Sequence, residues 1–352
     1  STGTARNPPR LGRHTAQTDL TPASDKKHRA TTWPSPQDFN EAMQTPEIAF
    51  EIAELKQGAA ELNMMGMPKV ASGAFASVYK MECPQRNWAV RCFLHPVHDR
   101  QYRYEQLSKY VCSDDLDCTV NFEYVSRGIK VASDFYPILK MEWVEGTPFH
   151  LCIEETLQQG QSLVPLLEKF RAMMESLHRA GIAHGDLQHG NIIVRDSELV
   201  LVDYDGMFVP SLSMEQSNEL GHPNYQHPAR SKDHFGAYLD NFSAHLIDTS
   251  LVALSLDSKL WQEFDGGDER LLFGRKDLQT PKASKIFTVL RHHAESEIRQ
   301  RAENLLSLID MPLTEIPALA ADGSHLSPVC SLMPSKDNPS RSSLPSWLIE
   351  DG

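Results

Sequence analysis

The spacing of hydrophobic residues along the chain predicts both helices and strands. Apolar side chains recur every three or four residues, as on one face of a helix, in residues 48–62, 98–111 and 166–180. Helical patterns return in residues 251–256, 261–264 and 283–308. Segments typical of strands occupy residues 70–82, 87–93, 122–146 and 192–202. The helix predicted over residues 166–180 is followed by Gly181, a natural stop, and leads directly into a polar loop.

The two ends of the chain lack any regular apolar spacing. Residues 1–45 are rich in Thr, Pro, Arg and Gln, and residues 312–352 contain clustered Pro and Ser. A segment with few apolar residues cannot bury enough surface to offset the entropy lost on ordering. We therefore expect a disordered tail at each end, with the folded part of the chain between them.

Residues 184–206 (HGDLQHGNIIVRDSELVLVDYDG) hold the most informative arrangement of polar side chains. Asp186 and Asn191 lie five positions apart in a predicted loop, and a predicted hairpin over residues 192–202 brings Asp203 back toward them. Transfer of a phosphoryl group to a hydroxyl needs one carboxylate to receive or orient the hydroxyl proton. It also needs an Asn and a second carboxylate to hold Mg²⁺. The pattern therefore predicts a phosphoryl-transfer site with Asp186, Asn191 and Asp203 as its catalytic residues.

Four other segments contain candidate functional residues. Residues 70–82 (VASGAFASVYKME) form two predicted strands around a turn of small residues, where backbone N–H groups can approach a phosphate. Residues 87–93 (NWAVRCF) form a buried strand that contains Arg91. Residues 138–146 (ILKMEWVEG) end another strand, and residues 221–228 (GHPNYQHP) lie between the polar loop and Asp240.

Taken in order, these segments resemble the protein-kinase-like superfamily over about residues 65–310. Residues 70–82 resemble the glycine-rich loop, although only Gly73 remains glycine. Arg91 stands where protein kinases carry the phosphate-binding lysine, and Ala229 stands where their activation segment ends in Glu. The resemblance implies an α+β, bilobal fold, with a strand-rich lobe in residues 46–145 and a larger helical lobe in residues 146–311.

The resemblance also implies a role for each residue of the site. Asp186 would orient the acceptor hydroxyl, and Asn191 and Asp203 would hold Mg²⁺ on ATP. The expected contacts to the nucleotide are Gly73, Ala74, Phe75, Val78, Ala89, Arg91, Glu105, Met141, Glu142 and Val144. A guanidinium contacts phosphate differently from a compact ammonium, so Arg91 is the main departure from the usual site.

Three further side chains have roles that the resemblance suggests. Glu105, on the predicted helix over residues 98–111, is expected to pair with Arg91 or to be a solvated glutamate. Asp205 is either a second metal ligand or a solvated turn residue. Asp240 is expected to accept N–H groups from the catalytic loop and also to cap the helix that follows it.

Composition narrows the classes of partner. A net charge of −13 argues against nucleic-acid binding through a broad basic surface. No apolar run approaches the roughly 20 residues that span a bilayer, and no signal-peptide pattern opens the chain. The six cysteines contain no C-x-x-C pair, which is typical of reduced thiols in a cytoplasmic protein. The oligomeric state is not indicated.

Two functions of different classes remain open. The first is an ATP- and Mg²⁺-dependent serine/threonine kinase with a protein substrate, favoured because Asp186, Asn191 and Asp203 are all present. A phosphotransferase that acts on a small molecule is a variant of this first hypothesis. The second is a pseudokinase that binds nucleotide and acts on a regulatory protein partner. The reduced glycine loop, Arg91 and the missing Glu after Pro228 favour it.

Overall fold

The computed structural model describes residues 33–325, apart from residues 74, 97–98, 113–115 and 213–215. From Pro34 onward these residues belong to one compact unit. Ala74, most of the expected first tail and residues 326–352 of the second lie outside the described residues. Within the described part of the chain, no helix has both the length and the apolar character needed to cross a membrane.

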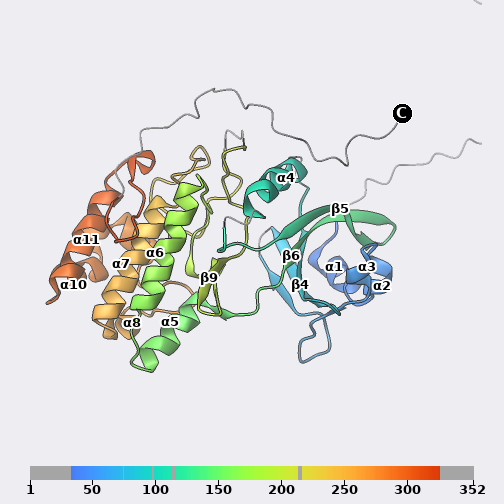
Figure 1. Ribbon diagram of the computed structural model, residues 1–352, viewed down its shortest axis with the longest axis horizontal. Coiled ribbons are helices and arrows are strands. Elements are labelled where there is room, and N and C mark those ends of the chain that lie inside the picture. The colour runs from blue at the N-terminus through green and yellow to red at the C-terminus, as the bar shows by residue number, and fades with distance from the viewer. Residues whose placement is uncertain (1–32, 74, 97–98, 113–115, 213–215, 326–352) are drawn as a thin grey trace, which may run out of the picture. The chain divides into compact units, whose positions relative to one another are not determined.

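An antiparallel sheet forms the strand-rich lobe (Figure 1). Its strands are β1 (Ala59–Ala60), β2 (Val70–Ser72), β3 (Ala76–Glu82), β4 (Trp88–Phe93), β5 (Phe122–Val131) and β6 (Asp134–Glu142). Their order is β1-β3-β4-β6-β5, and β2 also pairs with β3. The register places Arg91 on β4 between Val78 on β3 and Leu139 on β6. The candidate phosphate-binding residue therefore lies on a central strand.

Three short helices cover part of this sheet: α1 (Pro36–Ala42), α2 (Pro46–Ala49) and α3 (Ala53–Lys56). Ser35 and Asp38 form a capping box at the start of α1. Phe39 and Met43 are buried in one apolar cluster with Phe50 and with residues of the sheet. The expected tail therefore ends before residue 36, because two apolar residues four positions apart were enough to anchor a short helix.

The single helix expected over residues 48–62 is also wrong. Phe50 leaves the helical conformation and forms a β-bridge with Ile129, so α2 and α3 are separate turns. The chain then enters β1 at Ala59. Long-range pairing with β5 therefore overrides the local helical spacing.

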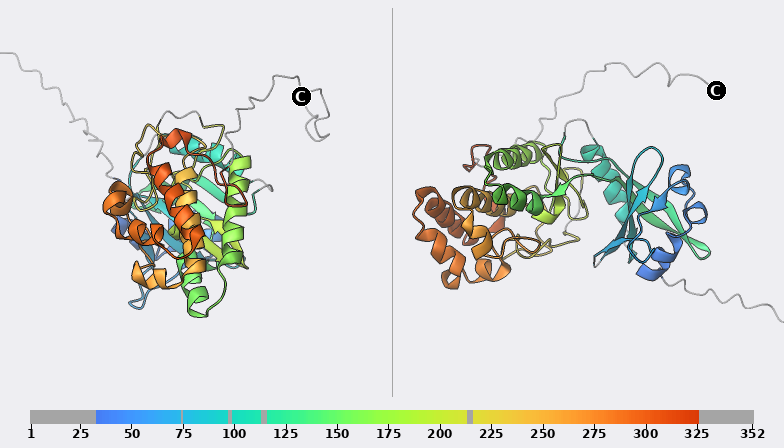
Figure 2. Two further views of the ribbon diagram at one scale, coloured as in Figure 1. Left: turned by 90° about the vertical axis from the view of Figure 1, so that its left-hand side faces the viewer. Right: turned by 90° about the horizontal axis from the view of Figure 1, so that it is seen from below.

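The second lobe is mainly helical. Its helices are α5 (Phe149–Gln158), α6 (Val164–Arg179), α7 (Asn241–Leu256), α8 (Lys259–Glu263), α9 (Arg275–Gln279), α10 (Lys285–Arg291) and α11 (Ser296–Ile309), with single 3-10 turns η1 (His189–Asn191), η2 (Pro281–Ala283) and η3 (Leu313–Glu315). Figures 1 and 2 show α6 and α11 beside α7, which is almost entirely buried. The predicted apolar stripe of α6 is confirmed, since Leu166, Phe170 and Leu177 are all buried.

Two expectations for the end of the chain need correction. The helix predicted over residues 283–308 is divided into α10 and α11, and Ser284 caps the first of them. The second tail does not begin at residue 312, because Leu313, Ile316 and Leu319 are buried. Side chains of α7 and α11 bind the carbonyl groups of this segment, which holds it against the helices.

A small sheet between the lobes carries the polar loop predicted from the sequence. It contains β7 (Thr147–Pro148), β8 (Ile192–Arg195) and β9 (Glu198–Leu201). Asp196 and Ser197 both have positive φ, as a tight two-residue hairpin turn requires. The hairpin is confirmed, and it returns the chain to Asp203. The α+β, bilobal architecture expected from the sequence is thus confirmed.

Candidate nucleotide and phosphoryl-transfer site

A cavity of about 280 Å³ lies between the large sheet and the β8–β9 hairpin. The predicted residues that line it are Val78, Ala89, Arg91, Met141, Glu142, Val144, Asn191 and Asp203. Six lining residues were not among the predicted contacts: Ala71, Leu139, Trp143, Ile193, Val202 and Tyr204. Most of these six are apolar residues of strands or strand ends, which the sequence does not distinguish from ordinary core.

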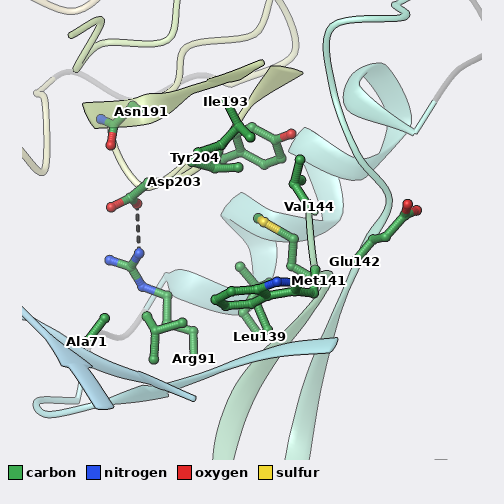
Figure 3. A pocket seen from close by; sticks show the side chains of 14 residues that line it. Ala71, Arg91, Leu139, Met141, Glu142, Val144, Asn191, Ile193, Asp203 and Tyr204 are labelled. Atoms are coloured by element: carbon green, nitrogen blue, oxygen red, sulfur yellow. Dashed lines mark hydrogen bonds and ion pairs between the residues drawn. The ribbon is translucent and has the colours of Figure 1, made fainter. Parts of the chain in front are cut away.

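The walls of the cavity are apolar on two facing sides. Leu139 and Met141 come from β6, and Ile193 comes from β8 on the other side (Figure 3). Apolar walls that enclose a few polar groups are typical of sites for a planar organic ligand. At the rim, the Glu142 carboxylate forms an ion pair of 3.2 Å with Arg195. The N–H of Glu142 donates to the carbonyl of Asn121, so that N–H already has a protein partner.

The glycine-rich turn contributes less to this cavity than expected. Gly73 and Phe75 lie in the turn between β2 and β3, but neither lines the cavity, and Phe75 is half exposed. Gly73 donates its N–H to the carbonyl of Ala76 within the turn. Ala71, on β2 before the turn, is the small residue that reaches the cavity (Figure 3).

The structure brings Asp186 and Asn191 together as predicted. The amide of Asn191 donates to the Asp186 carbonyl at 2.8 Å and to its carboxylate at 3.1 Å. The other carboxylate oxygen of Asp186 accepts the N–H of His222 at 2.6 Å. Asp186 is thereby oriented from two sides, by its own loop and by the segment over residues 221–228.

Asp240 has one of the two roles expected of it. Its carboxylate accepts the N–H groups of His184 and Gly185, the latter at 2.9 Å, which fixes the start of the loop that contains Asp186. Asp240 also occupies the N-cap position of α7, but its side chain makes no capping hydrogen bond. The capping role is wrong because both carboxylate oxygens are already used by the loop.

Gly185 occupies the position before Asp186 for a steric reason. Its φ is +79°, and a Cβ there would lie 2.0 Å from the carbonyl oxygen of Gly206. The backbones at residues 185 and 206 therefore pass too closely for any side chain. His184, buried beneath this crossing, hydrogen-bonds the Val202 carbonyl at 2.9 Å.

Arg91 binds two carboxylates that lie just after the β8–β9 hairpin. Its Nη1 donates to Asp203 at 2.7 Å, and its Nη2 donates to Asp205. A dashed line marks the contact with Asp203 in Figure 3. Asp205 also accepts the hydroxyl hydrogen of Tyr104. The solvated-turn alternative for Asp205 is therefore wrong: its side chain is 13% exposed and both oxygens have partners.

The expected pair between Glu105 and Arg91 is absent. Glu105 lies on the exposed side of α4 (Arg100–Val111), where it accepts a hydrogen bond from Gln101 at 2.9 Å. Successive residues of a helix point about 100° apart. Because Tyr104 faces inward, Glu105 faces solvent, and the spacing alone does not say which of the two reaches the site.

Burial and clustered carboxylates shape the electrostatics beside Arg91. Burial raises the pKa of Asp205, although the guanidinium of Arg91 opposes this effect. Burial, together with the nearby Asp205 and Asp203, raises the pKa of Glu219 to about 8. Sequence reasoning missed Glu219, because nothing in its local pattern indicates that the chain returns to the site there.

The backbone at Asp203 adopts a conformation that is unusual for a residue other than glycine. Its φ is +65°, in the left-handed region that Asp tolerates better than most residues. Tyr204, the next residue, is fully buried, and its hydroxyl hydrogen-bonds the backbone of Leu201 and Val120. The anchored tyrosine therefore keeps this conformation in place and directs Asp203 toward the cavity.

Comparison with known proteins finds partial similarities. No protein-family model matches the chain. It is 28% identical over 143 residues to a probable bifunctional tRNA threonylcarbamoyladenosine biosynthesis protein of Methanothermobacter thermautotrophicus, covering 38% of this chain and 24% of that protein. A protein of the same name from Methanosarcina mazei is 26% identical over 170 residues, covering 44% and 29%.

A kinase is also among the similar proteins. The RIO-type serine/threonine-protein kinase Rio1 of Haloferax volcanii is 40% identical over 57 residues, which are 16% of each chain. The chain thus spans less than a third of the length of any of these three relatives. Over part of its length, it is similar to tRNA threonylcarbamoyladenosine biosynthesis proteins and to a RIO-type kinase.

Proposed function

We propose that this chain is an ATP- and Mg²⁺-dependent phosphotransferase with a protein-kinase-like fold. The observation that carries the proposal is the placement of Asp186, Asn191 and Asp203 beside an apolar cavity. Asn191 and Asp203 line that cavity, and Asn191 hydrogen-bonds Asp186. Asp186 orients the acceptor hydroxyl, and the similarity to a RIO-type kinase supports this reaction class.

The donor atoms at the cavity fit a nucleotide with its metal ion. Asn191 and Asp203 offer the oxygen ligands that Mg²⁺ prefers, and bound Mg²⁺ would offset charge that develops on the phosphates. Arg91 is partly buried, and its Nε atom is buried and has no hydrogen-bond partner among the described residues. A buried guanidinium N–H at the cavity wall is suited to a phosphate oxygen. The left-handed backbone at Asp203 is typical of strained residues at functional sites.

A pseudokinase that binds nucleotide is the second candidate. One observation favours it: Arg91 already neutralises Asp203, the carboxylate that would hold the metal. A metal ion must replace that ion pair before it can bind, which weakens its affinity. In this reading the chain binds nucleotide with little turnover and signals to a protein partner.

The acceptor is best sought among proteins. The relatives include one named as a serine/threonine-protein kinase and two named for tRNA threonylcarbamoyladenosine biosynthesis. With a net charge of −13, the chain has no broad basic field for RNA, so we propose a protein substrate or partner rather than tRNA. A small hydroxyl compound is the remaining alternative.

The decisive experiment compares phosphate transfer from Mg²⁺–ATP by the wild type, Asp186→Ala and Asp203→Ala. We expect both variants to lose transfer, and we expect Asp186→Ala to retain nucleotide affinity because Asp186 does not line the cavity. Equal rates of phosphate transfer by all three proteins would overturn the proposal that the chain is a phosphotransferase. Stabilisation of the wild type by ATP without turnover would support the pseudokinase instead.

A further inference from the structure

The guanidinium group of Arg91 is held in place by two carboxylates. The side chain is 14% exposed and projects from a central strand, between Val78 and Leu139 in register. Its two Nη atoms bind two different carboxylates, those of Asp203 and Asp205. Only Asp203 lines the nucleotide cavity, so the two contacts face different surroundings.

Asp205 is fixed from the side opposite Arg91. One of its oxygens accepts the hydroxyl of Tyr104, and the other accepts Nη2 of Arg91. The preceding residue, Tyr204, is anchored by hydrogen bonds to the backbone of Val120 and Leu201. Asp205 is therefore held by its side chain and by its neighbour in the chain.

Tyr104 is itself rigidly placed by aromatic neighbours. Its ring stacks on Tyr124 with centroids 5.8 Å apart and meets the edge of Phe122 at 5.7 Å. Phe93, two residues beyond Arg91 on β4, lies 6.1 Å away. This packing leaves the ring of Tyr104 little freedom, so its hydroxyl stays directed at Asp205.

We propose that Tyr104 and Asp205 are positioning residues that hold the guanidinium of Arg91 at the nucleotide cavity. Asp205 acts as a permanent counter-ion for Arg91, in the role that the kinase resemblance would assign to Glu105. The contact between Arg91 and Asp203 can then open for phosphate and metal while the contact with Asp205 remains. This inference rests on the proposed function, because its consequence is tighter binding of a nucleotide phosphate.

The first test measures the affinity for Mg²⁺–ATP and the steady-state constants of Asp205→Asn and Tyr104→Phe. We expect Asp205→Asn to weaken affinity by about tenfold and Tyr104→Phe by a smaller factor, mainly through KM for ATP. Tyr104→Phe retains the ring packing and controls for misfolding of the other variant. Tyr102→Phe, on the exposed side of the same helix, is the matched control. Unchanged affinity in both positioning variants, or a loss with Glu105→Gln, would overturn the inference.

The second test does not depend on nucleotide binding. A double-mutant cycle in chemical unfolding combines Arg91→Gln with Asp205→Asn, and in parallel with Glu105→Gln. We expect non-additive shifts of the unfolding midpoint for the first pair and additive shifts for the second. Additive shifts for the pair with Asp205 would refute the inference. If the wild type binds no nucleotide, the proposed function fails, and the cycle alone decides whether Asp205 holds Arg91.

Discussion

At the scale of single residues, the site depends on places where no side chain fits. Gly221 has a φ of +77°, and a Cβ there would lie 2.9 Å from a carboxylate oxygen of Asp186. The amide nitrogen of Gln226 would lie even closer, at 2.5 Å. The glycine therefore lets the segment over residues 221–228 approach Asp186 and donate the N–H of His222 to it.

Gly221→Ala should reduce phosphate transfer by about tenfold or more while nucleotide affinity stays unchanged. The added methyl group displaces Asp186 or the N–H of His222, and neither group lines the cavity that we propose for the nucleotide. Gly160→Ala is the matched control, because Gly160 has a similar φ of +65° with no atom within 4 Å of the added carbon. Equal loss of transfer in both variants would mean that backbone strain, and not the contact with Asp186, is responsible.

The residue scale also shows where a sequence pattern stops being informative. The helix over α4 was predicted, but its rotation about its own axis was not. A one-residue difference decides whether an acid, Glu105, or a phenol, Tyr104, faces Arg91. The packing of Tyr104 against Tyr124 and Phe122 determines that rotation, and those partners lie on β5, outside the helix.

At the scale of elements, the segment over residues 36–56 is part of the folded protein. Phe39 on α1 is fully buried among residues of the sheet. In residues 36–45 the few apolar residues are separated by polar ones, so the composition of that part alone resembles a tail. The sheet supplies the partner surface that the composition does not reveal.

Phe39→Ala should lower the free energy of unfolding by about 3–5 kcal/mol, as expected for a buried aromatic side chain. Denaturant unfolding monitored by fluorescence or circular dichroism measures the change. Ile48→Ala in the same segment is the control, since Ile48 is 66% exposed and should change stability by no more than about 0.5 kcal/mol. A similar small effect at Phe39 would contradict the packing of α1 on the sheet.

A buried ion triad joins three helices of the second lobe. Asp248 on α7 is fully buried and binds Arg171 on α6 at 2.6 Å and Arg301 on α11 at 2.8 Å. Arg301 also donates to the carbonyl of Gly323, which attaches the segment after η3 to the helices. The triad therefore connects the core helix α7 to the end of the described chain.

Asp248→Ala should destabilise the protein by about 3–5 kcal/mol, because it removes the buried carboxylate that two largely buried guanidinium groups share. The exposed carboxylate of Glu297, 3.8 Å from Arg301, is a weaker partner. The exposed pair between Arg291 and Glu303 provides the comparison, and Glu303→Ala should cost no more than about 1 kcal/mol. Unfolding by denaturant at constant pH separates the two outcomes. Equal costs would show that burial of the triad contributes nothing.

At the scale of the whole molecule, buried histidines couple stability to pH. Burial lowers the pKa of His189 and of His245 to about 4. Both are neutral in the folded protein near pH 7, and each ring bonds a backbone carbonyl. The unfolded chain takes up protons at these histidines below about pH 6.5, before the folded protein does. The contribution of these two neutral histidines to the free energy of unfolding is therefore complete above about pH 6.5 and is lost as the pH falls toward about 4.

The difference in stability between the wild type and His245→Gln should shrink as the pH falls from 6.5 to 4, by up to about 3 kcal/mol. Comparing the two proteins at each pH separates the effect of His245 from that of Glu219, which both proteins contain. The raised pKa of Glu219 acts in the opposite direction, because stability is lost as the pH rises and its carboxyl group ionises. Glutamine can still donate to the carbonyl of Pro317. Denaturant unfolding at several pH values measures the difference, and a constant value would contradict the burial of a neutral His245.

Local patterns in the sequence were sufficient to predict the order of the segments, the hairpin and the grouping of Asp186, Asn191 and Asp203. These features depend on local spacing, because a short loop followed by a short hairpin keeps the three side chains close together. The residues that surround this group depend instead on the tertiary structure. Asp205 contacts Arg91, Tyr104 contacts Asp205, and Glu219 lies near these carboxylates, although the three come from different segments of the chain. The burial of Phe39 and of Leu313 likewise depends on surfaces that other elements supply. Local spacing contains no information about which distant surface a side chain will meet.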